Sequence, residues 1–411
     1  MAKKEGRSSS RNVFFRDQEM NFTVLRALLG VHSDGATIGE CLAVVQNTRN
    51  GDIEGFVGQW IRISEHCANR AEEALAHHDR VRAREFFFRA ANFAKSAMVI
   101  LNPLDRRHRL YWQTSLDLFL KAGALLELPL EQLPVDFEGE ILPCFFLPAA
   151  KGRKSPVVVI VTGGEGCAVE NYFWAGAYAL KNGYSVLLYE GPGNIATMHT
   201  NGLLQRPDSE VPIGRVLDHL LARPDVDDAR VALLGLSFGG YLVARAAAFD
   251  KRIKAVIPDS PLRNIHRMLK SVLPSFTFSL PNFLMEFVKN HLMSYSDRAT
   301  LDLLLWEGGV ATFREGVERL KPFSIEGIEH QITCPTLALT GDGEGTQFVA
   351  QAREFLANIG ATEKVIREFH NSEGAGSHCQ ADNSFLMNQE VIAWLNHVFS
   401  GPPVDPVASS N

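Results

Sequence analysis

One short motif constrains the fold of this chain more than any other feature. The residues Gly235-Leu236-Ser237-Phe238-Gly239 match the pattern G-x-S-x-G, with the apolar run VALLG leading into it and the run YLVARAAAF following it. The pattern alone also fits an ordinary glycine-rich turn, but a strand before it and a helix after it are the context that a nucleophilic serine requires. A Cβ on either flanking glycine would clash with the neighbouring strand and helix. The motif therefore predicts a strand–turn–helix unit that presents Ser237 as a nucleophile.

The hydrophobic pattern divides the chain at about residue 135. Residues 13–134 carry apolar side chains at helical spacing and contain no convincing strand. Beyond them, short apolar runs alternate with helical stretches, which indicates a mostly parallel sheet covered by helices on both faces. The predicted strands are 140–148, 156–162, 184–190, 230–235, 254–259, 335–340 and 363–369.

This pattern predicts one α/β core with two added helical segments, flanked by two tails. The expected segments are a disordered tail at 1–12, a helical cap at 13–134, an α/β core at 135–261 and 331–400, a helical insertion at 262–330 that contributes to the cap, and a tail at 401–411. The insertion and the N-terminal helices hold many Phe and Trp residues. Most of these should form the core of the cap, and a minority should line an apolar pocket.

Composition excludes several classes of protein. Apolar residues make up 46% of the 411 residues, which indicates a globular chain. A net charge of −6 argues against binding to nucleic acid, and no apolar run is long enough to indicate a membrane span. The six cysteines are scattered without a C-x-x-C pair, which predicts a reducing compartment and no metal site. We therefore expect a cytoplasmic protein without a metal or cofactor.

A serine nucleophile needs a histidine base and a carboxylate that orients the base. In proteins with this serine turn, the acid follows a late strand and the histidine follows the last one. His378 lies in a glycine-rich loop after the strand 363–369, whereas His370 directly abuts that strand. Asp342 is the first carboxylate after the strand 335–340 and is the favoured acid. Asp259, after the preceding strand, and Glu344, two residues beyond Asp342, are the alternatives.

Two backbone N–H groups should stabilise the oxyanion. The first would be that of Phe238, at the start of the helix behind the serine. The second would be that of Gly164 or Glu165, in the glycine-rich turn after the strand 156–162, and the sequence does not choose between them. This turn lacks the patterns of a phosphate-binding loop.

Several segments together resemble one branch of the α/β-hydrolases. They are EFFFRAANFAKSA, LPCFFLPA, VVVIVTGGEG, YEGPG, GLSFGGY and GAGSHCQADN, and the resemblance covers roughly residues 75–400. This branch includes the fungal yellowish-green-type hydrolases, which shorten a polyketide chain, and the bacterial dihydroxypseudooxynicotine hydrolase. The resemblance implies a triad of Ser237, Asp342 and His378, N-terminal helices that cap the active site, and room for a homodimer. The chain departs from the expected pattern at Gly164-Glu165-Gly166, where a bulkier residue usually follows the paired glycines, and in its GDGEG acid loop.

The expected function is therefore hydrolysis of a small apolar, aromatic or polyketide-type molecule by a serine nucleophile. The resemblance favours cleavage of a carbon–carbon bond in a β-dicarbonyl compound, a retro-Claisen reaction of secondary or pigment metabolism. An esterase, a thioesterase or an acyltransferase would use the same three residues. A peptidase is disfavoured by the helical N-terminus, and a pseudo-enzyme by the intact set of Ser, acid and His.

Overall fold

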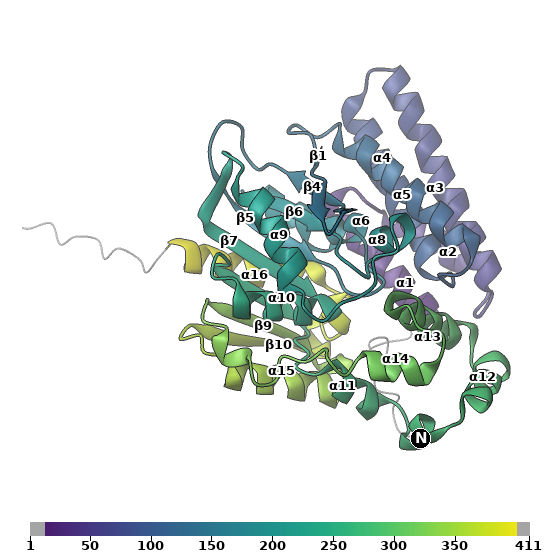
Figure 1. Ribbon diagram of the computed structural model, residues 1–411. Helices are drawn as coiled ribbons and strands as arrows, with labels where there is room; N and C mark the ends of the chain where they lie inside the picture. The colour runs from purple at the N-terminus through teal and green to yellow at the C-terminus, as the bar shows by residue number, and fades with distance from the viewer. Residues whose placement is uncertain (1–12, 401–411) are drawn as a thin grey trace, which may run out of the picture.

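A central eight-stranded sheet organises the computed structural model, which describes residues 13–400 (Figure 1). The tails expected at 1–12 and 401–411 lie outside the described residues. The strand order is β1-β4-β6-β5-β7-β8-β9-β10. The strands are β1 (Glu131–Gln132), β4 (Cys144–Leu147), β5 (Ser155–Val161), β6 (Ser185–Tyr189), β7 (Val226–Leu236), β8 (Ala255–Asp259), β9 (Thr336–Gly341) and β10 (Lys364–Phe369).

The six strands from β6 to β10 in this order pair in parallel, and β4 and β1 add antiparallel neighbours at one edge. The predicted mostly parallel sheet is confirmed. The strand expected at 140–148 is instead interrupted at Pro143, which has no N–H to donate. Its first part is β3 (Glu140–Leu142), which pairs with β2 (Val135–Phe137) in a separate hairpin, and only β4 joins the main sheet.

The two faces of the sheet build two hydrophobic cores, as the alternation along β5 shows. Val157, Val159 and Val161 pack into one core with α9 (Glu210–Leu221), α10 (Phe238–Phe249) and α15 (Thr346–Asn358). Val158 and Ile160 pack into the other core, with α7 (Ala177–Lys181) and α16 (Ser384–Ser400). This second core continues into the N-terminal helices, so those helices are anchored to the sheet by continuous apolar packing.

Two helical segments, one before the sheet in the chain and one inserted between β8 and β9, contact each other. The N-terminal helices are α1 (Gln18–Leu28), α2 (Ile38–Gln46), α3 (Ile53–Ala76), α4 (Arg80–Val99) and α5 (Arg106–Gly123). The segment between β8 and β9 folds into α11 (Ile265–Val272), α12 (Asn282–His291), α13 (Tyr295–Gly308) and α14 (Phe313–Arg319). Figure 1 shows α13 next to the N-terminal helices and α12 projecting from the body. Asn102 joins the two segments, since its N–H donates to the Tyr295 hydroxyl at 3.0 Å and its Nδ2 to Asp302 at 2.6 Å.

Across residues 13–400, every helix is either too short or too polar to span a bilayer.

Candidate active site

Ser237 lies on the turn between β7 and α10, where the motif predicts it. Its backbone has φ 58° and ψ −121°, which is strained for a residue with a Cβ. The two glycines of the motif are required by close packing of the backbone. A Cβ on Gly235 would lie 2.2 Å from the Gly239 carbonyl oxygen, and one on Gly239 would lie 2.3 Å from the Val161 carbonyl oxygen. The turn therefore presents the serine from a tightly packed junction of strand and helix.

His378 connects this serine to a buried carboxylate. Its Nε2 lies 2.7 Å from Ser237 Oγ, and its Nδ1 lies 2.5 Å from Glu344 Oε1. His378 is 4% exposed and Glu344 is 1% exposed. With Nδ1 donating to the carboxylate, Nε2 is free to accept the proton of the serine hydroxyl. The three side chains form a continuous hydrogen-bonded chain from the nucleophile to the acid.

Glu344 is held as an anion by a shell of donors. Its Oε1 accepts from the Cys379 N–H and the Ser260 hydroxyl, and its Oε2 from the Thr340 hydroxyl and the Gly341 N–H. Burial alone would raise the pKa of Glu344, but His378 and these donors outweigh burial and lower it. A negative charge is therefore fixed behind the imidazole.

Asp342, the acid favoured by the sequence analysis, does not occupy this position. Its Oδ1 accepts from the N–H and Nδ2 of Asn371 at 2.9 and 2.7 Å, and its Oδ2 lies 3.3 Å from His370 Nδ1. Asp342 and His370 are both largely exposed. A short 3₁₀ turn, Asp342–Glu344, follows β9 and directs its first carboxylate outward and its third residue inward. The structure therefore places Glu344 against His378. The sequence analysis kept Glu344 only as an alternative to Asp342.

Asp259, the other alternative, supports the site through its backbone. Its carbonyl oxygen accepts from the Ser237 N–H at 3.1 Å. Its side chain is fully buried beside Gln380 and Cys379. Burial and the nearby charge of Glu344 raise the pKa of Asp259 well above its usual value, which favours its neutral form.

The loop after β5 adjoins the first turn of α10, as the prediction of an oxyanion site requires. A Cβ on Gly163 would lie 3.0 Å from Ser237 Cβ and 3.4 Å from the Phe238 nitrogen. Phe238 is the first residue of α10, where backbone N–H groups have no partner within the helix. The Gly163 carbonyl oxygen accepts from Asn194 Nδ2 at 3.1 Å, so the Gly164 N–H of the same trans peptide points away from Asn194.

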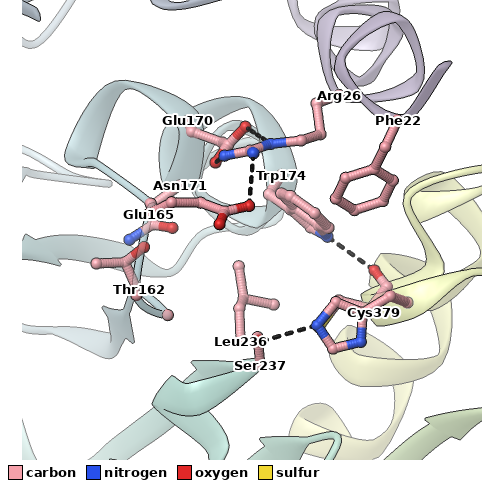
Figure 2. A pocket seen from close by; sticks show the side chains of 14 residues that line it. Phe22, Arg26, Thr162, Glu165, Glu170, Asn171, Trp174, Leu236, Ser237 and Cys379 are labelled. Atoms are coloured by element: carbon pink, nitrogen blue, oxygen red, sulfur yellow. Dashed lines mark hydrogen bonds and ion pairs between the residues drawn. The ribbon is translucent and has the colours of Figure 1, made fainter. Parts of the chain in front are cut away.

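A cavity opens above these groups (Figure 2). Phe22 and Arg26 of α1, Trp174 and the loop 163–166 line it together with Ser237. The Trp174 indole N–H donates to the Cys379 carbonyl at 2.9 Å and so braces the loop that carries the histidine. The cavity therefore lies between Ser237 and the N-terminal helix α1.

A metal ion does not fit the group of ligand-type atoms at this site. Glu344, His378 and Cys379 bring such atoms within 4.8 Å of one another. Both imidazole nitrogens, however, are already engaged by the serine and the glutamate. Burial raises the pKa of the Cys379 thiol well above its usual range, so the thiolate that a metal needs is disfavoured.

Sequence reasoning missed a cluster of charged side chains, of which Arg26 and Glu170 line the same cavity. Arg26 from α1 binds Glu170 of α6 (Ala168–Asn171), and Lys95 of α4 binds the same carboxylate. Arg26 stands between Leu25 and Ala27, and a charged residue among apolar neighbours is a signal that the sequence does contain. Arg26 and Glu170 lie 144 positions apart, however, so no local spacing indicates that they pair.

Comparison with known proteins adds relatives of nearly full length. No family model matches the chain. It is 31% identical over 405 residues to hydrolase LUC6 of a Fusarium species, covering 92% of this chain and 96% of the relative. It is 30% identical over 414 residues to 20-hydroxy-prefusarin hydrolase FUS2 of Gibberella moniliformis, covering 94% and 98%. The solved 2,6-dihydroxy-pseudo-oxynicotine hydrolase shares the fold, with a TM-score of 0.71 at 20% identity over 91% of this chain and 95% of that one.

Proposed function

This chain is an α/β-hydrolase, an enzyme of the hydrolase class, and from that premise we propose that Ser237, His378 and Glu344 form its catalytic triad. The observation that carries the proposal is the unbroken hydrogen-bonded chain from Ser237 Oγ through His378 to the buried carboxylate. Asp342, the triad acid expected from the resemblance, is replaced in this proposal by Glu344.

In the proposed reaction, His378 Nε2 takes the proton of Ser237 as the serine oxygen attacks a carbonyl carbon. Glu344 keeps the imidazole in the tautomer that can accept this proton and stabilises the imidazolium that forms. The N–H of Phe238 and that of Gly164 or Glu165 bind the oxyanion. Each such donor typically contributes about 3–4 kcal/mol to stabilisation of the transition state. Water then attacks the acyl-serine, with His378 acting as the base.

We propose further that the scissile bond is the carbon–carbon bond of a β-dicarbonyl compound. Attack on one carbonyl breaks the bond to the central carbon, and the electron pair leaves on an enolate that His378 protonates. After hydrolysis the products are a carboxylic acid and a ketone. The resemblance to polyketide-shortening hydrolases and the aromatic lining of the cavity, with Phe22 and Trp174, support this assignment.

The assignment is tested with benzoylacetone and phenyl butyrate as parallel substrates. Wild-type protein should release equal amounts of an acid and a ketone from benzoylacetone, and Ser237→Ala should release neither. Chromatography with mass detection quantifies both products. Cleavage of phenyl butyrate without cleavage of benzoylacetone would contradict the carbon–carbon assignment and favour the esterase. Products that appear only with an added alcohol would favour the acyltransferase.

We propose further that the enzyme works in a reducing compartment and assembles as a homodimer. All six cysteines of the sequence are free thiols, which supports a reducing compartment such as the cytoplasm. The resemblance also suggests a homodimer, and light scattering of the purified protein tests this assembly.

A further inference from the structure

Three charged side chains line one wall of the cavity that contains Ser237, and a fourth, Lys95, pairs with them from α4. Arg26, Lys95 and Glu170 are 4%, 0% and 3% exposed, and Glu165 is 17% exposed. Lys95 comes from α4, and Arg26, Glu165 and Glu170 line the cavity directly. Figure 2 shows the Glu165 carboxylate between Arg26 and the floor of the cavity. Removing such charges from water is costly unless each is paired.

Glu170 pairs with both cations at once. Its carboxylate accepts from Arg26 Nε at 2.6 Å, from Arg26 Nη2 at 2.5 Å and from Lys95 Nζ at 3.0 Å. Burial by itself would raise the pKa of Glu170, but Arg26 and Lys95 outweigh burial and lower it to about 2. One carboxylate on α6 therefore faces two cationic side chains on α1 and α4.

Glu165 supplies the second negative charge from a loop. Its Oε1 lies 2.9 Å from Arg26 Nη1, the nitrogen that Glu170 does not use. Glu165 stands between Gly164 and Gly166, whereas Arg26, Lys95 and Glu170 lie on packed helices. The negative partner of Arg26 Nη1 is thus the most exposed of the four side chains, and it is the one that lies on a loop between two glycines.

We propose that Arg26 Nη1 is a subsite for an anionic oxygen of the substrate, and that Glu165 occupies this subsite until the substrate displaces it. The inference rests on the proposed function, because it places this oxygen on the molecule that Ser237 attacks. A guanidinium forms strong charge-assisted bonds to such oxygens and does not give up its proton. The oxygen can belong to a carboxylate or to the enolate of a β-dicarbonyl group, and both present the same chemistry to Arg26.

The test uses protection of Ser237 from a fluorophosphonate probe by three small methyl esters of matched length. Methyl hydrogen succinate carries a carboxylate, methyl acetoacetate carries an enolisable β-ketone, and methyl butyrate carries neither. For the wild type, at least one of the first two should protect at a concentration about tenfold below that of methyl butyrate. Whichever ester protects identifies the source of the oxygen.

Variants of Arg26 and Glu165 test whether this pair causes the preference for an ester that carries an anionic or enolisable oxygen. Arg26→Met should remove it, Arg26→Lys should keep part of it, and Glu165→Gln should strengthen it because the internal competitor is weakened. Arg353→Met, which alters an exposed ion pair with Glu368, should leave it unchanged. Equal protection by all three esters in the wild type, or an unchanged preference in Arg26→Met, would overturn the inference. A wild type that the probe does not label at Ser237 would instead overturn the proposed function, and labelling of Arg26→Met shows that this variant is folded.

Discussion

Glu344 and His378 lie 2.5 Å apart, from Oε1 to Nδ1, and both side chains are buried. Replacing this carboxylate by an amide removes the charge that stabilises the imidazolium and disturbs the required tautomer. Glu344→Gln should therefore lower kcat by roughly 10³- to 10⁴-fold. Steady-state kinetics on an activated ester measure the loss.

Asp342→Asn is the matched control, since it makes the same chemical change two residues away in the same turn. Asp342 is exposed and faces Asn371 and His370. The kcat of the Asp342→Asn variant should therefore fall by no more than about threefold. A larger loss in Asp342→Asn than in Glu344→Gln would restore the aspartate as the acid.

Asp259 should tolerate an amide although it is the most enclosed carboxyl group near the site. Burial and the charge of Glu344 raise its pKa well above the usual value, which favours the protonated carboxyl group. Asp259→Asn replaces a carboxyl group whose neutral form is favoured with a neutral amide of similar shape. We expect the pH profile of kcat/KM to keep its shape and kcat to stay within about threefold. A loss comparable to that of Glu344→Gln would show that Asp259 acts as a charged residue.

Gly239→Ala tests the packing of the serine turn. The added Cβ would lie 2.3 Å from the Val161 carbonyl oxygen, so backbone must shift. The expected loss of unfolding free energy is about 1–3 kcal/mol, measured by urea titration. A Cβ at Gly58, an exposed residue near the N-terminal end of α3, meets nothing within 4 Å, so Gly58→Ala should raise the unfolding free energy by about 0.5–1 kcal/mol instead. Equal effects of the two substitutions would contradict the packing argument.

Two histidines at the junction of α5, α13 and α8 (Ile195–Thr200) predict a loss of stability in acid. His108 Nδ1 lies 2.8 Å from His199 Nε2, and the rings of His199 and Trp306 lie 5.0 Å apart. Burial lowers the pKa of His108 to about 3 and that of His199 to about 4. As the pH falls, both histidines are therefore protonated in the unfolded chain before they are protonated in the folded one. The unfolding free energy consequently falls as the pH drops below about 6.5.

His108→Gln removes one of these two sites. Relative to the wild type, this variant should lose less unfolding free energy between about pH 8 and about pH 5, as measured by urea titration at each pH. Parallel pH dependence in the two proteins would show that this histidine does not contribute.

The sequence predicts those parts of the molecule that depend on neighbouring residues. The turn at Ser237 is predictable because the glycines on either side are needed for local backbone contacts. The parallel sheet is predictable because its strands are buried on both faces and form continuous apolar runs. The prediction of one strand at 140–148 is wrong because Pro143 lacks an N–H: β3 ends before it and pairs in a separate hairpin, and only β4 joins the main sheet.

The acid and the charged wall of the cavity depend on three-dimensional geometry instead. Asp342 and Glu344 share one loop, and only the direction of its 3₁₀ turn decides which of them reaches His378. Arg26, Lys95 and Glu170 come from separate helices, so their meeting depends on how the N-terminal helices pack against the sheet. The sequence indicates Glu165 only as a backbone N–H donor, because the contact of its side chain with Arg26 forms only in the folded chain.

Peptide mass spectrometry after reaction with a fluorophosphonate probe tests most directly whether Ser237 is the nucleophile. We predict one adduct on the peptide that contains Ser237, strongly slowed labelling in His378→Ala, and no adduct in Ser237→Ala. An adduct on another residue of the wild type, or labelling that persists in Ser237→Ala, would show that Ser237 is not the nucleophile.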